Sequence, residues 1–363
     1  MKPGKEGYRV AVVGASSLLG KELVAVLGEG KFPVSRLVTF STDEDAPELP
    51  IIDLSAASKT SVQDGDVNEA ELDFAFLAAP LHELPAFLRS WQDQAGAAHC
   101  LVIDLIGEGL GGTAGDREAA AAPPAQQVKV PFLDRLFPVA GVESDPAQVF
   151  VSAHPAVIVI SSLLLRLAAR FPLQTAVAQV FGSASESGSR GIEELQRQAM
   201  NLLSFQKIPR QVFGEQLAFN LLSRLGHKGT GEAAGLEARL TRQLRQYLGE
   251  RVPLPALRRF QAPVFYSLGV SLYVETSETV APEAAAAALA GERVRVRRST
   301  QDAPTLIEVT GSSDILVDRI VSDAARPTGL WLWAVADNLR LAATNAVEIA
   351  ASRRAPENAY EDG

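Results

Sequence analysis

Tyr8-Arg-Val-Ala-Val-Val-Gly-Ala-Ser-Ser-Leu-Leu-Gly20 is the stretch that decides the fold of this chain. The apolar residues 8–13 predict a buried strand, the glycines at 14 and 20 bound a tight turn, and the following Lys21-Glu-Leu-Val-Ala-Val-Leu27 has the apolar spacing of a helix. A strand, a glycine turn and a helix in this order open a dinucleotide-binding domain. The stretch therefore predicts an α/β fold whose first domain binds a nucleotide.

Apolar strands continue after this opening and alternate with helical patterns. Strands are predicted at residues 36–40, 50–54, 74–78 and 101–105, with a helix at 84–94. This alternation predicts a parallel, doubly wound sheet of the Rossmann type. Residues 107–127 are rich in glycine, alanine and proline and have no apolar period, which indicates a loop.

The second half of the chain predicts a central α/β domain. The expected elements are helices at residues 157–169, 191–203 and 237–248, strands at 173–180, 264–275 and 293–297, and a last helix at 330–353 that returns to the first domain. The expected division is a dinucleotide-binding domain at 1–137 completed by a C-terminal helix at 326–353, a dimerisation or substrate-type domain at 138–325, and a polar tail at 354–363.

The composition narrows the class of protein. The 363 residues are 47% hydrophobic and 21% charged, and the net charge of −9 without a long basic run argues against binding to nucleic acid or to an anionic membrane. The longest apolar stretch, residues 156–165, is too short to span a bilayer. The single cysteine, Cys100, excludes an intrachain disulfide and favours a reducing compartment, so we expect a cytoplasmic protein.

Four separated segments carry a family resemblance. They are Gly14-Ala-Ser-Ser-Leu-Leu-Gly20, Gly188-Ser-Arg-Gly-Ile-Glu-Glu-Leu195, Glu215-Gln-Leu-Ala-Phe-Asn220 and Asp337-Asn-Leu-Arg-Leu-Ala-Ala-Thr-Asn-Ala346. In this order they resemble segments of aspartate-semialdehyde dehydrogenase. The resemblance implies a dimer formed by the central domain. It also implies NADP-dependent oxidation of L-aspartate 4-semialdehyde to an acyl phosphate, through a cysteine thiohemiacetal.

The residues that carry the family's chemistry are replaced in this chain. The family's Asn-Cys-Ser/Thr signature aligns so that Val157 takes the place of the nucleophile. Its Arg-Val-Pro-Val-x-x-Gly-His-Ser strand aligns with residues 261–269, which puts Leu268 at the acid/base histidine, and its acyl-positioning glutamine falls on Gly182. Valine cannot attack a carbonyl and leucine cannot transfer a proton. The alignment therefore predicts that no residue catalyses the family's reaction.

The two substrate-holding positions are changed as well. The same alignment places Gln261 at the substrate arginine, and it places Gln243, in a helix at residues 236–248, at the glutamate that pairs with the substrate amine. Arg258 and Arg259 lie close upstream of Gln261. They either replace the lost positive charge or are simply solvated.

The cofactor site is less altered. The resemblance places it at Gly14, Ala15, Ser16, Ser17, Leu18, Leu19, Gly20, Thr42 and Asp43. Ser17 replaces the middle glycine of the turn and can still donate a hydrogen bond. Asp43 and Glu44 have two possible roles. Their carboxylates either repel the 2′-phosphate of NADP and accept a hydrogen bond from the ribose of NAD, or they belong to a solvated loop. NAD or NADP is the expected cofactor, and no metal is expected because the histidines have no metal-ligand spacing.

Three functions remain open on the sequence. The first is a non-catalytic homologue with a binding or regulatory role, as a homodimer that acts alone or with another protein. The second is a divergent NAD(P)-dependent oxidoreductase that acts on another small carbonyl compound without a covalent thioester, using Tyr266, His154 or Ser185. The third keeps the family's reaction through Cys100, although nothing near Cys100 in the sequence would stabilise a thiolate.

Overall fold

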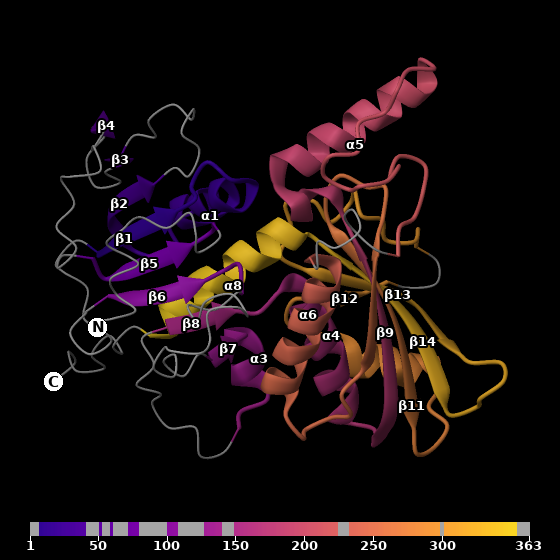
Figure 1. Ribbon diagram of the computed structural model, residues 1–363. Helices are drawn as coiled ribbons and strands as arrows, with labels where there is room; N and C mark the ends of the chain where they lie inside the picture. The colour runs from indigo at the N-terminus through magenta and orange to yellow at the C-terminus, as the bar shows by residue number, and fades with distance from the viewer. Residues whose placement is uncertain are drawn as a thin grey trace, which may run out of the picture. The chain divides into compact units, whose positions relative to one another are not determined.

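The computed structural model describes residues 7–40, 51–52, 59–60, 72–79, 100–107, 127–139, 149–223, 232–297 and 301–353 (Figure 1). The chain divides into two compact units. The first consists of residues 1–153 and 342–363, and the second of residues 154–341.

The first unit is built on a sheet with the strand order β4-β3-β2-β1-β5-β6-β8-β7. The strands are β1 (Tyr8–Val13), β2 (Val34–Phe40), β3 (Ile51–Ile52), β4 (Lys59–Thr60), β5 (Phe74–Leu77), β6 (Leu101–Asp104), β7 (Gln127–Lys129) and β8 (Val149–Ser152). β1 pairs in parallel with β2 and with β5, and the parallel pairing continues through β6, β8 and β7. This confirms the predicted doubly wound sheet, to which β3 and β4 add an antiparallel edge.

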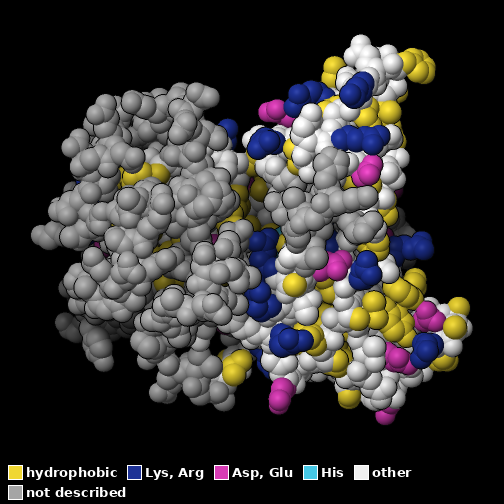
Figure 2. Space-filling view, viewed as in Figure 1, with side chains coloured by type: hydrophobic (Ala, Val, Ile, Leu, Met, Phe, Trp, Pro, Cys, Tyr) yellow, Lys and Arg dark blue, Asp and Glu magenta, His cyan; other side chains and the backbone are white. Residues whose placement is uncertain are grey.

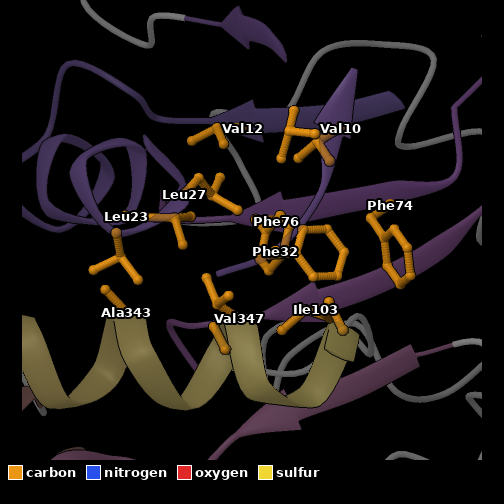
Figure 3. Close-up of a cluster of buried hydrophobic side chains, with 14 of the residues drawn as sticks. Val10, Val12, Leu23, Leu27, Phe32, Phe74, Phe76, Ile103, Ala343 and Val347 are labelled. Atoms are coloured by element: carbon orange, nitrogen blue, oxygen red, sulfur yellow. The ribbon is translucent and has the colours of Figure 1, made fainter. Parts of the chain in front are cut away.

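Two helices far apart in the sequence cover one face of this sheet. They are α1 (Leu18–Gly28) and α8 (Asn338–Ser352). Figure 3 shows Leu23 and Leu27 of α1 and Ala343 and Val347 of α8 turned toward the sheet, where they join one buried cluster. Tyr8, Phe32 and Phe74 pack ring against ring in the same cluster. A further short helix, α3 (Pro131–Leu136), follows β7.

The second unit holds a sheet with the strand order β10-β9-β11-β14-β13-β12. The strands are β9 (Leu173–Gly182), β10 (Ala256–Gln261), β11 (Leu268–Thr276), β12 (Val294–Val296), β13 (Ile315–Ser322) and β14 (Gly329–Ala336). The helices are α4 (Pro155–Ala168), α5 (Gly188–Leu203), α6 (Glu232–Leu248) and α7 (Pro282–Leu289), and a short 3-10 turn, η3 (Ala184–Ser187), precedes α5. α4 packs on β9, β11 and β14, and α6 and α7 pack against α4.

The predicted last helix at residues 330–353 is wrong in its first third. Residues 329–336 form β14, and α8 begins at Asn338. Leu330-Trp-Leu-Trp333 alternates between buried and half-buried side chains, which is the period of a strand, and pairing with both β11 and β13 fixes it in the sheet. Asp337 separates the two elements, because its Oδ1 accepts hydrogen bonds from the backbone N–H groups of Leu339 and Arg340.

The expected domain boundaries also shift. The first unit continues to residue 153, not to 137, because β8 belongs to the first sheet. The second unit continues to residue 341, not to 325, because β14 belongs to the second sheet. β10, β13 and α7 were not predicted from the sequence. The predicted helix at 84–94, most of the predicted loop at 107–127 and the tail at 354–363 lie outside the described residues.

None of the helices among the described residues combines the length and the apolar character needed to cross a membrane.

Candidate functional site

The turn between β1 and α1 depends on the absence of side chains at two positions. Gly14 has a φ of +79°, and a Cβ there would lie 2.6 Å from the Cβ of Ala79. A Cβ at Gly20 would collide with the backbone oxygen of Gly14. Both glycines are therefore required by the close approach of the helix to the strand.

Ser17 is the N-cap of α1. Its Oγ accepts a hydrogen bond from the backbone N–H of Gly20 at 2.9 Å and donates one to the carbonyl of Ala78 at 3.2 Å. The hydrogen bond that Ser17 can donate thus goes to the carbonyl of Ala78, directly after β5. Helix geometry leaves the first-turn N–H groups of Leu18 and Leu19 without an intrahelical acceptor.

This turn fits the diphosphate of a dinucleotide. First-turn amides and the positive end of an eleven-residue helix attract a phosphate group. Ala15 and Ser16 complete the turn between the two glycines. Thr42 and Asp43, which are predicted to belong to the cofactor site, lie outside the described residues.

In the second unit, His154 starts the helix on which the predicted nucleophile position lies. It is the N-cap of α4, and its Nδ1 accepts a hydrogen bond from the N–H of Ala156 at 3.1 Å. The N–H of His154 itself donates to Oε1 of Gln243 on α6 at 2.9 Å. Gln243, predicted at a substrate-binding position, is a buried residue that ties α6 to the start of α4.

Val157 and Leu268 are completely buried. Val157 faces inward in the first turn of α4, and Leu268 is the first residue of β11, paired with Ala336 of β14. Ser267, directly before Leu268, has a φ of +70°, which is the left-handed conformation that favours glycine. The family's strand carries glycine at this position, so the backbone supports the alignment that puts Leu268 at the histidine.

Gly182, at the predicted acyl-positioning position, ends β9 beside a buried ion pair. Arg259 of β10 and Glu186 of η3 form this pair, and their side chains are only 4% and 9% exposed. A Cβ at Gly182 would lie 2.6 Å from Nη2 of Arg259 and 2.6 Å from Oε2 of Glu186. The missing side chain of Gly182 is therefore what makes room for the ion pair.

Gln261 and Glu237 hold Arg259 in place. Oε1 of Gln261 accepts from Nη2 of Arg259 at 2.8 Å, and Nε2 of Gln261 donates to the carbonyl of Gly182 at 3.1 Å. Oε1 of Glu237, on α6, accepts from the backbone N–H of Arg259 at 2.8 Å. Arg258 points the other way, is largely exposed, and forms an ion pair with Glu237. The side chain of Arg258 is therefore solvated, which was one of the two alternatives for these arginines. The side chain of Arg259 is buried and not solvated.

Comparison with known proteins identifies the architecture. Residues 9–108 match the family "Semialdehyde dehydrogenase, NAD binding domain", and residues 164–341 match "Semialdehyde dehydrogenase, dimerisation domain". The chain belongs to the semialdehyde dehydrogenase family. The NAD binding match confirms the expectation of an NAD(P)-type site in the first unit.

Two similar relatives are USG-1 protein homologs. The one from Pseudomonas aeruginosa is 30% identical over 349 residues, covering 93% of this chain and 95% of the relative. The one from Azotobacter vinelandii is 31% identical over 350 residues, covering 94% and 96%. Aspartate-semialdehyde dehydrogenase of Rickettsia bellii is 25% identical over 354 residues, covering 94% and 96%.

Solved structures show the same fold. A probable aspartate-semialdehyde dehydrogenase from Pseudomonas aeruginosa superposes with a TM-score of 0.76 at 26% identity, covering 95% of this chain and 98% of that chain. The aspartate-semialdehyde dehydrogenase of Candida albicans with NADP superposes with a TM-score of 0.59 at 13% identity, covering 95% and 97%.

The protonation of His154 limits what this family member can do at the start of α4. Burial lowers the pKa of His154 to about 4, although the charge of Glu186 acts in the opposite direction. The imidazole is therefore neutral near pH 7. Because Nδ1 accepts from Ala156, the proton lies on Nε2, and neither nitrogen is available as a base.

Ser185, Tyr266 and Cys100 are the other residues that were predicted as alternatives for catalysis. Ser185 Oγ is buried and shares hydrogen bonds with Ser183 and Asn338, while Tyr266 is 39% exposed. Cys100 lies in the other unit, next to β6, where burial and the charge of Asp73 raise the pKa of its thiol far above its usual range. A thiol held protonated is not a nucleophile. Within the described part of the chain, no three His, Cys, Asp or Glu residues cluster as metal ligands would.

Glu186 and Glu237 were not predicted to belong to the site. Glu186 lies 73 positions from Arg259 along the chain, so spacing alone could not pair them. A usable signal was present in β10, where Arg259 and Gln261 are two residues apart and so share one face of the strand. A basic side chain on a buried face requires an acidic partner.

Proposed function

We propose that this protein is a semialdehyde-dehydrogenase-like protein that does not carry out the phosphorylating oxidation of aspartate semialdehyde and has a binding or regulatory role. The carrying observation is the buried Val157 at the nucleophile position in α4. The single cysteine of the chain lies in the other unit, protonated and buried. The family's reaction needs a thiol, since hydride leaves from its tetrahedral adduct and phosphate then attacks the thioester.

The neighbouring positions support the same proposal. Leu268 cannot transfer a proton, and the space at Gly182 is filled by the Arg259–Glu186 pair. In another enzyme, the loss of a nucleophile reduces turnover on the order of a millionfold. No supporting residue restores a loss of that size.

Turnover tests this proposal directly. Purified protein is incubated with aspartate semialdehyde, phosphate and NADP or NAD, and the reduced nicotinamide is followed by absorbance. We expect the rate to equal that of the sample without protein. A rate that rises in proportion to protein concentration, and that persists in a Cys100→Ser variant, would refute the proposal and point to a nucleophile outside the residues considered.

We propose that the first unit nevertheless binds NAD or NADP. The geometry of Gly14 and Gly20 and the first-turn amides of Leu18 and Leu19 support this part. Because the resemblance to the family assigns the acidic Asp43 to the position where the family binds the 2′-phosphate, we expect tighter binding of NADH than of NADPH. Fluorescence titration with both nucleotides measures the two dissociation constants. Equal constants for the wild type and for Asp43→Asn would remove Asp43 from the site.

We propose a homodimer formed by the central domain. The dimerisation-domain match covers this domain. α4, α6 and α7 pack on one face of its sheet, while the side chains of Phe181, Phe260, Trp331 and Trp333 lie half-buried on the other face in contact with one another or with Tyr273. Among the described residues no helix packs on this aromatic face. Aromatic side chains gathered on a sheet face are typical of a protein interface.

The dimer is tested by light scattering after size-exclusion chromatography. Phe260→Ser should shift the mass from dimer toward monomer, since it removes an aromatic ring from the proposed interface. Val139→Ser, which changes an exposed apolar residue of the first unit, is the matched control and should leave the mass unchanged. A wild-type monomer at micromolar concentration would refute this part.

We also propose a cytoplasmic location, which rests on the single cysteine.

A second candidate is a divergent NAD(P)-dependent oxidoreductase for another small carbonyl compound. The intact glycine turn favours it, because a ketone accepts hydride without a covalent adduct. Oxidation of NADH or NADPH with a panel of small ketones, aldehydes and imines tests it. Activity that Tyr266→Phe removes would establish this candidate, and no oxidation with any of these compounds would eliminate it for these substrates.

A further inference from the structure

The buried face of β10 carries a positive charge and an amide side by side. Arg259 and Gln261 are both buried, whereas Arg258 and Phe260, which alternate with them, are more exposed. The two buried side chains meet the end of β9 at Gly182 and the turn η3. A guanidinium group and an amide on one face present several N–H donors to the same space.

Arg259 forms two hydrogen bonds that do not involve Glu186. Its backbone N–H donates to Glu237 at 2.8 Å, and its Nη2 donates to Gln261 at 2.8 Å. Gln261 is in turn anchored on the carbonyl of Gly182 at 3.1 Å. Contacts from β10 and α6 therefore orient the guanidinium group so that it can bind a carboxylate.

Glu186 supplies that carboxylate, but it meets Arg259 through one oxygen only. Nε of Arg259 donates to Oε2 of Glu186 at 3.1 Å, and Nη2 donates to the same oxygen. Oε1 of Glu186 is buried and has no hydrogen-bond partner. The usual arginine–carboxylate pair engages both oxygens in a fork, and a buried oxygen left unpaired is rare enough to require an explanation.

The turn that carries Glu186 is fixed from several sides. The N–H groups of Ala184 and Ser185 each donate at 2.9 Å to backbone carbonyls, those of Val264 and Phe265. The hydroxyl of Ser185 exchanges hydrogen bonds with Asn338. The contact with Arg259 is therefore imposed by the fold of the chain.

We propose that Glu186 is an internal ligand: its carboxylate occupies a carboxylate site formed by Arg259, Gln261 and the space above Gly182, and closes that site to small free carboxylates. This inference rests on the proposed function and deepens it, because it concerns the same part of the central domain. It gives the reason why a substrate-like carboxylate is not bound there.

Removal of the internal carboxylate tests the inference. Glu186→Ala leaves Arg259 and the space above Gly182 open, and formate or acetate should then stabilise the protein saturably. At ten times the dissociation constant, the unfolding equilibrium constant falls about elevenfold by mass action. The measurement is urea unfolding in formate against chloride at the same ionic strength. The wild type should show no difference between the two salts.

Two variants make the test specific. Glu193→Ala removes an exposed glutamate of the neighbouring helix α5 and should respond as the wild type does. Glu186→Ala combined with Arg259→Met should lose the response to formate, because the guanidinium group is gone. If Glu186→Ala does not fold in chloride, the yield of refolded protein in formate against chloride replaces the unfolding curve, and a higher yield in formate is expected.

Three results would overturn the inference. One is a response of Glu186→Ala no larger than that of Glu193→Ala, and another is an equal refolding yield in both salts. The third is stabilisation of the wild type by formate that Arg259→Met abolishes, since the site would then be open. None of these outcomes depends on dehydrogenase turnover, so the inference and the proposed function can fail separately.

Discussion

The glycine turn of the first unit and the Arg259–Glu186 ion pair of the second differ in the kind of interaction that forms them. At the turn, the features that matter are backbone features: the left-handed φ of Gly14, the close packing at Gly20 and the first-turn amides of α1. At the Arg259 site, the features that matter are side chains, and Gly182 leaves its space to an internal ion pair. The turn therefore depends on backbone geometry, whereas the second region depends on which side chains are present.

This difference follows from the cost of each change. A substitution at Gly14 or Gly20 breaks the packing of the helix on the strand, so the fold itself maintains the turn. The fold places no such requirement on the position of Val157 in α4, because a buried site tolerates an apolar side chain of suitable volume.

The largest effect is expected from Arg259→Met, which leaves Glu186 as an uncompensated buried charge. Loss of one partner of a buried pair costs about 3–5 kcal/mol. Arg258→Met, next to it on β10 but largely exposed, should change the free energy of unfolding by less than about 0.5 kcal/mol. Urea unfolding of both variants measures the difference. Equal costs would show that the pair contributes no more than a surface ion pair.

The next largest effect is the pH dependence due to His154. Its pKa in the folded protein is about 4, below the usual 6.5, because burial disfavours the charged ring. The unfolded chain therefore binds the proton first, and stability should fall as the pH drops from 6.5 to 4, by up to about 3 kcal/mol. The lowered pKa of Glu186, which Arg259 and His154 hold down against burial, removes further stability only below about its usual 4.5.

His154→Asn separates these contributions. Asparagine is a good N-cap without a titrating ring, so α4 should keep its cap. The variant should lose the decline between pH 6.5 and 4 and keep the decline at lower pH. A wild-type curve that is flat between pH 6.5 and 4 would contradict the lowered pKa of His154.

A smaller effect is expected from Gly20→Ala in the turn. The added Cβ meets the backbone of Gly14 and Ala15, and overpacking of this kind costs about 1–3 kcal/mol. Gly28→Ala, at the end of the same helix with no atom within 4 Å of the new Cβ, should instead stabilise by about 0.5–1 kcal/mol. Opposite signs in thermal unfolding are the expected result, and a tolerated Gly20→Ala would remove the argument that the fold preserves the turn.

The smallest effect concerns Ser17. Removal of the N-cap hydroxyl in Ser17→Ala should cost about 1 kcal/mol, whereas Ser17→Gly should cost only a few tenths. Ser17→Gly also removes the Cβ at the position where the family has glycine, so NADH should bind more tightly to it than to Ser17→Ala. Unfolding curves and nucleotide titrations of the pair measure both effects. Weaker binding of NADH to Ser17→Gly than to Ser17→Ala would show that the Cβ does not obstruct the diphosphate.

The sequence predicted those parts of the molecule in which local pattern and tertiary structure agree. β1, α1, α4 and α6 were found because their apolar period and their caps act within a few residues. β14 was taken for helix because Leu330-Trp-Leu-Trp333 runs directly into the helical pattern of α8, and its strand form depends on pairing with β11 and β13. Tertiary pairing overrides such local signals.

The candidate site was predicted unevenly for a similar reason. Resemblance to the family's motifs predicts that Val157, Leu268 and Gly182 stand where the family has catalytic residues, and the positive φ of Ser267 agrees with that register. The side chains that lie beside Gly182 were not predicted. The pairing of Arg259 with Glu186 depends on the crossing of β10, β9 and η3, which no spacing in the sequence encodes.

One measurement tests the contrast between the two regions most directly. Protein in excess over NADP is mixed with aspartate semialdehyde and phosphate, and nucleotide binding and nicotinamide reduction are followed in the same sample. We predict that the nucleotide is bound and that no NADPH forms in a single turnover, because the glycine turn leaves room for the diphosphate and the proposed nucleophile position holds the buried Val157. Formation of NADPH in an amount that approaches the NADP present would contradict the account.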